Sequence, residues 1–472
     1  METAVNSEKK ENNSSRNPLG TVPVKSLIWK FAIPSIIAML VTSIYNIVDQ
    51  FFIGQCVGSL GNAATSIFYP LTVGCISVSL LCGIGGASAF NLAMGMRKTK
   101  EAKYYVGNAI VIMILVSAAI MVVTLVFTEP LMMLFGSSDE ILPYALPYAR
   151  VCAIGFPVLV LQGGGTQLVR ADGRPMASMT VNLLGAAINV ILDALFVFVL
   201  GWGMAGAAAA TVIGQAVSAV LLIWYLVHFK TLKLDKEAFR LKASAAGRLL
   251  KLGMANFFTQ IAIMVVIILV NKSLNYYGEQ SIYGSATAVA ITGIAAKCMQ
   301  LVLSVVIGFS QGMQPITSYN YGAARYDRVK EAYLRTIRRA AVVPIIAWAL
   351  FQIFPTQIIG FFGDGDALYF EFGARYMHIA YAVLFTYFLQ PITGNFFSSI
   401  GKPQRGILIS LTRQIFFFLP LLFILPLFLG VDGILWGTSI ADAAAFVVCA
   451  IIAARELRRP EYRMQPPNHE KV

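Results

Sequence analysis

Lysine and arginine residues gather in clusters along this chain, and each pair of successive clusters encloses two long apolar stretches. The clusters lie at residues 25–30, 97–103, 170–174, 230–251, 325–339, 402–405 and 455–463. The short connections midway between clusters have almost no basic residues, and their charges are acidic, as at Glu129, Glu140 and Asp432. Because membrane insertion retains loops rich in Lys and Arg on the cytoplasmic side, the pattern predicts an even number of crossings with both termini in the cytoplasm.

The composition agrees with a membrane protein. Of the 472 residues, 57% are hydrophobic and 12% are charged, whereas about 25% of the residues of a soluble domain are charged. The net charge of +13 lies in loops next to the membrane. Contact with lipid headgroups explains it there, so no nucleic-acid partner is expected. The six cysteines are scattered mostly through apolar stretches and predict neither a disulfide framework nor a metal site. No cofactor is expected.

Twelve apolar stretches are long enough to cross a bilayer as helices, since a hydrocarbon core of about 30 Å needs about 20 residues. The stretches are continuous, whereas a transmembrane β-barrel would show short alternating segments. The sequence therefore predicts an all-α polytopic protein of the plasma membrane. The predicted spans are residues 27–53, 60–94, 106–127, 144–168, 176–200, 204–227, 250–274, 286–316, 340–359, 376–400, 406–429 and 434–454.

The two halves of the chain resemble each other. Gly-Arg-Pro at residues 173–175 recurs as Gly-Lys-Pro at 401–403, and Gly206 with Thr211 recurs as Gly433 with Thr438. Six spans per half return the chain to the same side, so the halves are predicted to be parallel repeats. Two six-helix lobes around a central cleft predict an alternating-access transporter. The predicted parts are a disordered cytoplasmic tail (1–25), an N-terminal lobe (26–229), a cytoplasmic linker (230–248), a C-terminal lobe (249–457) and a cytoplasmic tail (458–472).

Carboxylates in the spans of the first half are the leading candidates for a functional site. Asp49 in the first span and Asp193 in the fifth lie at similar depth in the outer half of the membrane, where ionisable residues are costly and by default functional. Asn189 shares a helix face with Asp193, and Thr211 of the sixth span lies at comparable depth. These groups predict a site for a proton or for Na⁺. The alternative is that both aspartates are structural, bonded to the backbone or to each other.

Further residues are secondary candidates. Asn46 shares a helix face with Asp49, and Asp442 lies in the outer half of the twelfth span with no other polar group near it in sequence. Pro34 removes one N–H from the first span and permits either a coupling hinge or a permanent bend. Methionine and aromatic side chains could line a substrate cleft or simply face lipid and neighbouring helices. The candidates for the cleft are Met39, Tyr45, Phe156 and Met313.

Ordered motifs across nearly the whole chain, from the first span to about Arg455, resemble those of the multidrug and toxin extrusion (MATE) transporters. Any one of them is weak, but together in register they are specific. They are Asn-Ile-Val-Asp at residues 46–49, Arg-Ala-Asp-Gly-Arg-Pro at 170–175, Asn-Val-Ile-Leu-Asp at 189–193, Gly-Ala-Ala-Ala-Ala-Thr at 206–211, Gln-Pro at 314–315 and Tyr-Asn-Tyr-Gly-Ala at 319–323.

The resemblance implies twelve helices in two lobes that form a V-shaped cleft, and export of organic cations against an inward flow of H⁺ or Na⁺. In similar transporters the cation site of the N-terminal lobe is formed by residues that Asp49, Asn189, Asp193 and Thr211 match one by one, and Pro34 matches the first-span proline. The seventh and tenth spans lack the acidic residues of some branches. The chain is therefore most similar to the bacterial branch related to DNA-damage-inducible proteins, with coupling in the N-terminal lobe.

Three classes of function remain. The favoured one is a secondary antiporter, expected to be a monomer in the bilayer, which exchanges small amphipathic organic cations for H⁺ or Na⁺. The alternative is a flippase for a lipid-linked saccharide or related amphiphile, but such proteins usually need a markedly cationic cleft. A membrane enzyme or channel is not expected, because the sequence has no HExxH or Walker-type motif.

Overall fold

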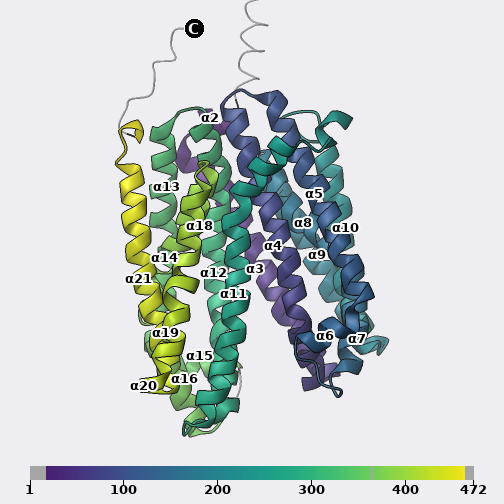
Figure 1. Ribbon diagram of the computed structural model, residues 1–472, viewed down its shortest axis with the longest axis vertical. Coiled ribbons are helices and arrows are strands. Elements are labelled where there is room, and N and C mark those ends of the chain that lie inside the picture. The colour runs from purple at the N-terminus through teal and green to yellow at the C-terminus, as the bar shows by residue number, and fades with distance from the viewer. Residues whose placement is uncertain (1–16, 363–364, 463–472) are drawn as a thin grey trace, which may run out of the picture.

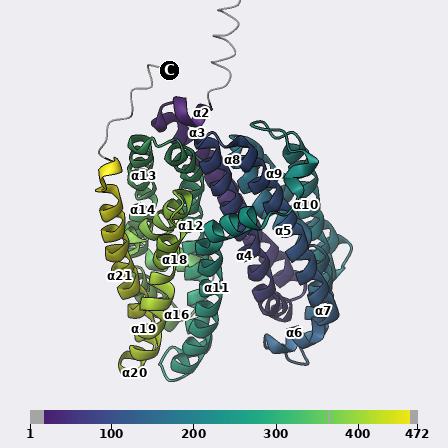
Figure 2. The same ribbon diagram turned by 45° about the horizontal axis from the view of Figure 1, so that its top comes forward.

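The computed structural model describes residues 17–362 and 365–462, and every regular element within these ranges is helical. Figure 1 shows two groups of long helices, which we call the N-lobe (α3 to α10) and the C-lobe (α11 to α21). The short α2 and the end of α21 lie at the same end of the molecule, which we call the termini end. The lobes approach each other there and diverge toward the opposite end, so the arrangement is V-shaped (Figures 1 and 2).

The bounds of the elements follow the chain in order. Before the linker they are α2 (Pro18–Thr21), α3 (Val24–Cys56), α4 (Ser59–Gly95), α5 (Thr99–Val126), α6 (Thr128–Leu134), α7 (Leu142–Ile154), α8 (Phe156–Ala171), α9 (Pro175–Asp193), the π-helix η1 (Ala194–Val199) and α10 (Gly203–Val227). The linker holds a 3₁₀-helix, η2 (Lys236–Phe239). The C-lobe contains α11 (Ala243–Glu279), α12 (Gly284–Gly322), α13 (Tyr326–Ala340), α14 (Val342–Ile353), α15 (Pro355–Phe362), α16 (Ala367–Ala380), η3 (Leu384–Thr386), α17 (Leu389–Ser399), α18 (Pro403–Leu411), the π-helix η4 (Thr412–Phe418), α19 (Leu419–Ile424), α20 (Pro426–Leu429) and α21 (Val431–Leu457), with η5 (Pro460–Tyr462) after it.

Ten helices of the described chain are long and apolar enough to cross a membrane, or eleven if α7 and α8 count as one span bent by 53°. Pro157 lies at the start of α8, where its missing N–H interrupts the helical hydrogen bonds. The predicted span at 376–400 is divided among α16, η3 and α17, and Pro391 near the start of α17 has the same effect there. The predicted class, an all-α protein with many membrane-spanning helices, is confirmed.

The repeated Gly-Arg-Pro and Gly-Lys-Pro motifs form equivalent turns at the termini end. Gly173 after α8 and Gly401 after α17 have φ of 83° and 77°, which glycine adopts without steric cost. Pro175 and Pro403 each occupy the first turn of the next helix, where the missing N–H has no helical partner to lose. The motifs are therefore explained by the need to reverse the chain sharply between two long helices.

Glycines allow the two lobes to touch at the termini end. A Cβ added to Gly253 of α11 would lie 1.8 Å from the carbonyl oxygen of Leu81 on α4, and one added to Gly85 would lie 2.1 Å from that of Leu249. The hydroxyls of Ser43 on α3 and Ser304 on α12 are 2.6 Å apart across the same interface. Small residues permit this backbone approach between membrane helices.

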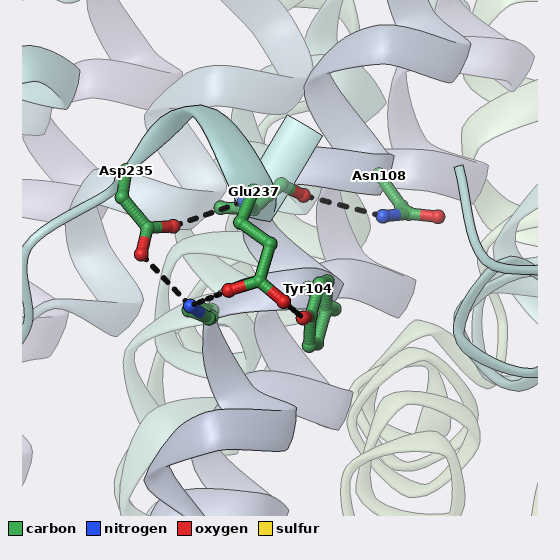
Figure 3. A network of polar contacts seen from close by, with 6 residues as sticks. Tyr104, Asn108, Asp235 and Glu237 are labelled. Atoms are coloured by element: carbon green, nitrogen blue, oxygen red, sulfur yellow. Dashed lines mark hydrogen bonds and ion pairs between the residues drawn. The ribbon is translucent and has the colours of Figure 1, made fainter. Parts of the chain in front are cut away.

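The linker is attached to α5 of the N-lobe by a network of polar contacts (Figure 3). Lys103 Nζ lies 2.8 Å from Asp235 Oδ2 and 2.8 Å from Glu237 Oε2, and the Tyr104 hydroxyl donates to Glu237. Asn108 Nδ2 donates to the carbonyl of Arg240 at 2.9 Å. The lysine and then the tyrosine lower the pKa of Glu237 from 4.5 to about 2. Glu237 therefore remains ionised at neutral pH, and the first part of the linker belongs structurally to the N-lobe.

Two predicted boundaries differ from the structure. Residues 1–16 of the predicted disordered tail lie outside the described residues, but its end is ordered, because the Leu19 carbonyl accepts hydrogen bonds from Asn320 Nδ2 at 2.9 Å and from Arg328 Nη2 at 3.1 Å. These donors belong to the C-lobe, and their demand for an acceptor explains why α2 packs there. At the linker, α11 begins at Ala243, so the last residues of the predicted segment 230–248 are helical.

Candidate cation-coupling site

Three helices of the N-lobe bring the four predicted coupling residues together. Asp49 lies on α3, Asn189 and Asp193 lie on α9, and Thr211 lies on α10. Helix α9 packs against both α3 and α10, so the sequence-distant groups become neighbours. Asp49 is 9% exposed, Asn189 is 3% exposed and Asp193 is fully buried.

The polar contacts within this group are few. Asn189 Nδ2 donates to Thr211 Oγ1 at 3.3 Å, which orients the amide so that its oxygen is free to act as an acceptor. The Asp49 and Asp193 carboxyl groups lie close enough for each to act on the charge of the other. Thr211 is therefore not satisfied only by its own helix backbone, and the two aspartates form one pair rather than two separate acids.

Oxygen atoms in this group lack hydrogen-bond donors. Among the described residues, no donor is bonded to Asp49 Oδ1, to Asn189 Oδ1 or to either carboxyl oxygen of Asp193, although all four atoms are buried. Buried polar atoms are almost always bonded in native proteins, and carboxylate and amide oxygens are the ligands of hard cations. The residues present therefore fit a proton shared by the carboxyls or a bound Na⁺.

Two further side chains near the aspartates were not predicted from the sequence. Tyr148 and Cys152 lie one turn apart on α7. Their side chains are close enough to Asp49 to interact electrostatically with its carboxylate, as is that of Tyr45 on α3. The Tyr148 ring also packs edge-on against Phe68, with centroids 5.4 Å apart. Their spacing of four residues places them on one helix face, but only the packing of the lobe shows that this face points toward Asp49.

A change of helix type accompanies the buried carboxylate of α9. The α-helical hydrogen bonding ends at Asp193 and is followed directly by the π-helix η1. A π-helical turn is rare and occurs frequently at functional sites. Asp193 thus lies at the junction between the α-helical and the π-helical segment.

The structure does not place all of the secondary candidates at this site. Asn46 is exposed on α3, whereas Asp49 on the same helix is buried. Two of the predicted cleft residues are wrong, because Phe156 is 1% exposed and stacks on Phe68, while Met313 is fully buried in the C-lobe core. Phe156 fills core space within the N-lobe, and Met313 belongs to a core cluster that α3 shares with helices of the C-lobe. Met39 is partly exposed at the interface between lobes, where its sulfur lies 3.9 Å from Gln311 Nε2.

Asp442 has a partner of its own in the C-lobe. Arg413, on the π-helix η4, donates to the Asp442 carboxylate of α21, and the guanidinium also lies 4.7 Å from the centroid of the Tyr387 ring. The pair is nearly buried, with the side chains 13% and 4% exposed. The charge of Asp442 is therefore already compensated, unlike those of Asp49 and Asp193.

A family model described as MatE matches this chain twice, over residues 34–195 and 257–424. The chain belongs to the MATE family. Curated relatives include the multidrug export protein MepA of Staphylococcus haemolyticus, 26% identical over 90% of this chain and 91% of that protein. They also include a FAD transporter of Shewanella oneidensis, 24% identical over 93% of this chain and 96% of that protein. As a MATE family member the chain is a membrane transporter and not an enzyme.

Solved structures agree with this assignment. One is described as the outward-facing conformation of a multidrug resistance MATE family transporter of the MOP superfamily. It superposes with a TM-score of 0.86 at 21% identity, over 94% of this chain and 98% of that chain. At this identity the likeness concerns the fold, and it confirms the predicted V-shaped arrangement of two six-helix lobes.

Proposed function

We propose that this MATE transporter exports amphipathic organic cations in exchange for H⁺ or Na⁺ by alternating access. The observation that carries the proposal is the buried pair of Asp49 and Asp193, three of whose four carboxyl oxygens lack donors among the described residues. Two neighbouring carboxylates disfavour each other's ionised form, so a proton or a metal cation between them is stabilising. No cofactor other than this coupling ion is required.

Binding of the coupling ion at the aspartate pair can act on the cleft through α3. Pro34 lies between two close contacts of α3 with glycines of α12, where Ala32 meets Gly312 and Ile36 meets Gly308. A bend at Pro34, where one helical hydrogen bond is absent, changes the direction of the segment that carries Asp49 while the contacts at the termini end hold. We propose that ion binding and drug binding favour different bends of α3.

The proposed orientation places both termini in the cytoplasm of a bacterial cell. The loops at the termini end carry the clusters of lysine and arginine, which membrane insertion retains inside. The lobes diverge at the other end, so the V opens outward. Each chain contains both lobes, so a monomer suffices for the cycle.

Export by inverted membrane vesicles tests the proposal. We expect a fluorescent cation such as ethidium to accumulate in vesicles that contain the protein, and the accumulation to stop when one gradient is removed. Nigericin in K⁺ medium removes the pH gradient, and omission of Na⁺ with added monensin removes the Na⁺ gradient. Accumulation that survives the loss of both gradients would contradict antiport.

The hinge at Pro34 is tested by Pro34→Ala. Linkage requires that drug and coupling ion lower each other's affinity by the same factor, and we expect the variant to keep drug binding but to lose most of this antagonism, because a complete helix resists bending. Drug affinity is titrated in detergent across pH and Na⁺ concentration. Pro70→Ala, in α4 of the same lobe, is the control. Equal pH and Na⁺ dependence in Pro34→Ala and the wild type would move the hinge elsewhere.

The flippase alternative has less support. A pyrophosphate needs several basic groups, yet α4 carries no lysine or arginine and α12 carries only Lys297. The lysines and arginines of α3 lie near its termini end, as do Arg248 and Lys251 of α11, whose remaining lysine, Lys272, lies near the other end of that helix. The four helices that meet between the lobes thus provide too little positive charge for a lipid-linked pyrophosphate.

A further inference from the structure

One face of α12 packs against α3, and the continuation of that face away from the termini end carries a lysine. Gly308 lies against Ile36, and Ser304 shares a hydrogen bond with Ser43. Lys297 precedes Ser304 by seven residues and Gly308 by eleven, which is about two and three full helical turns. Lys297 therefore lies on the same face, about 10 Å farther from the termini end than the Ser304 contact.

The exposure of α12 changes along this face. Ser304 and Gly308 are buried, whereas Gln300, Lys297 and Gly293 are exposed. A Cβ added to Gly293 would meet no atom within 4 Å. The face that α3 covers farther in is therefore uncovered here, on the part of α12 where the two lobes diverge.

The helix face of Lys297 argues against contact with lipid. The residue lies thirteen positions after the first residue of α12, or about 20 Å along the helix, on the face that α3 covers farther in. A charged side chain at such depth is costly in hydrocarbon and normally faces a polar cavity or a partner.

No carboxylate on the helices around this space is placed to neutralise Lys297. Helices α4 and α12 contain no Asp or Glu, and α11 contains only Glu279, its last residue. The one acid of α3 is Asp49, which is paired with Asp193 inside the N-lobe. Among the described residues, none of the ion pairs involves Lys297.

We infer that Lys297 binds the anionic group, a carboxylate or a phosphate, of an amphipathic substrate between the lobes. The inference rests on the proposed export function and narrows its substrate class. A purely cationic drug is repelled by the ammonium group, whereas a zwitterion places its anion on Lys297 and its cation toward the N-lobe. The ammonium offers three donors, and hydrogen bonds that involve charged groups are the stronger ones.

A matched pair of dyes tests this selectivity. Rhodamine 19 carries a free carboxylate, and rhodamine 6G is its ethyl ester and a pure cation. We expect Lys297→Gln to lower the affinity for rhodamine 19 about tenfold while the affinity for rhodamine 6G stays the same or rises. Binding is measured by fluorescence polarisation in detergent. Lys272→Gln, which removes an exposed lysine of α11 outside this face, should change neither affinity. An unchanged affinity of Lys297→Gln for rhodamine 19 would overturn the inference.

A second measurement does not depend on binding in detergent or on export. Lys297→Cys, in a background without native cysteines, should react with an impermeant methanethiosulfonate from outside the cell, and rhodamine 19 should slow the reaction more than rhodamine 6G does. Failure to react would place residue 297 in lipid or protein and overturn the inference. In nanodiscs, protection by anionic lipid alone would assign the lysine to a lipid phosphate instead. Failure of the proposed antiport appears separately, as dye accumulation that ignores both ion gradients.

Discussion

Replacement of Asp193 by asparagine is expected to reduce gradient-driven export to the level of vesicles that lack the protein. The substitution keeps the size of the side chain but removes the second carboxylate, so that Asp49 has no partner with which to share a proton or to hold Na⁺. Asp49→Asn should have the same effect. Both variants should remain folded, because each removes one member of a pair of buried carboxylates that repel each other when both are ionised.

Coupled transport in vesicles and the Tm in detergent provide the measurements. The double variant should be no worse than either single one, since residues that act as a unit are not additive. Asp432→Asn is the control, because that carboxylate is partly exposed and bonded to Arg375 at the opposite end of the C-lobe. If both single variants export drug at the wild-type rate, the coupling site lies elsewhere, and Asp442 becomes the next candidate.

The overall fold could be predicted from the sequence because the bilayer restricts it so strongly. A segment in hydrocarbon must satisfy its own backbone hydrogen bonds, so length and apolarity suffice to identify helices. The basic loops then indicate the side of the membrane on which each connection lies. Local departures were not predictable. The bend between α7 and α8 and the division of the tenth span at η3 depend on how proline-containing segments pack.

The coupling site could be predicted for a related reason. Asp49 and Asp193 are conspicuous because a carboxylate in a membrane span needs an explanation. Tyr148 and Phe156 show the limit of such reasoning, since aromatic residues are common in every span. The structure places Tyr148 near the aspartates and Phe156 in the core, a difference set by helix rotation, which hydropathy does not encode.

The second large effect is expected from Gly253→Ala. The added Cβ would lie 1.8 Å from the Leu81 carbonyl oxygen, a backbone atom that cannot rotate away. Helices α4 and α11 must therefore separate at the termini end, which destabilises the arrangement with the lobes closed there. Overpacking of this kind costs about 1–3 kcal/mol, enough to shift the equilibrium between the two access states by about 5- to 150-fold.

We expect Gly253→Ala to bind drug but to export it far more slowly, because the state that is open at the opposite end becomes rare. Spin labels at Ser66 on α4 and Asn275 on α11, both exposed near that end, should report a shorter distance in the variant by double electron–electron resonance. Gly247→Ala is the matched control on the same helix, since a Cβ there would meet no atom within 4 Å. Wild-type export and an unchanged distance in Gly253→Ala would show that the lobes need not approach this closely. If Gly253→Ala shows slower export and a shorter distance while Gly247→Ala shows neither, the glycine contact is the closure that makes the outward-open state possible.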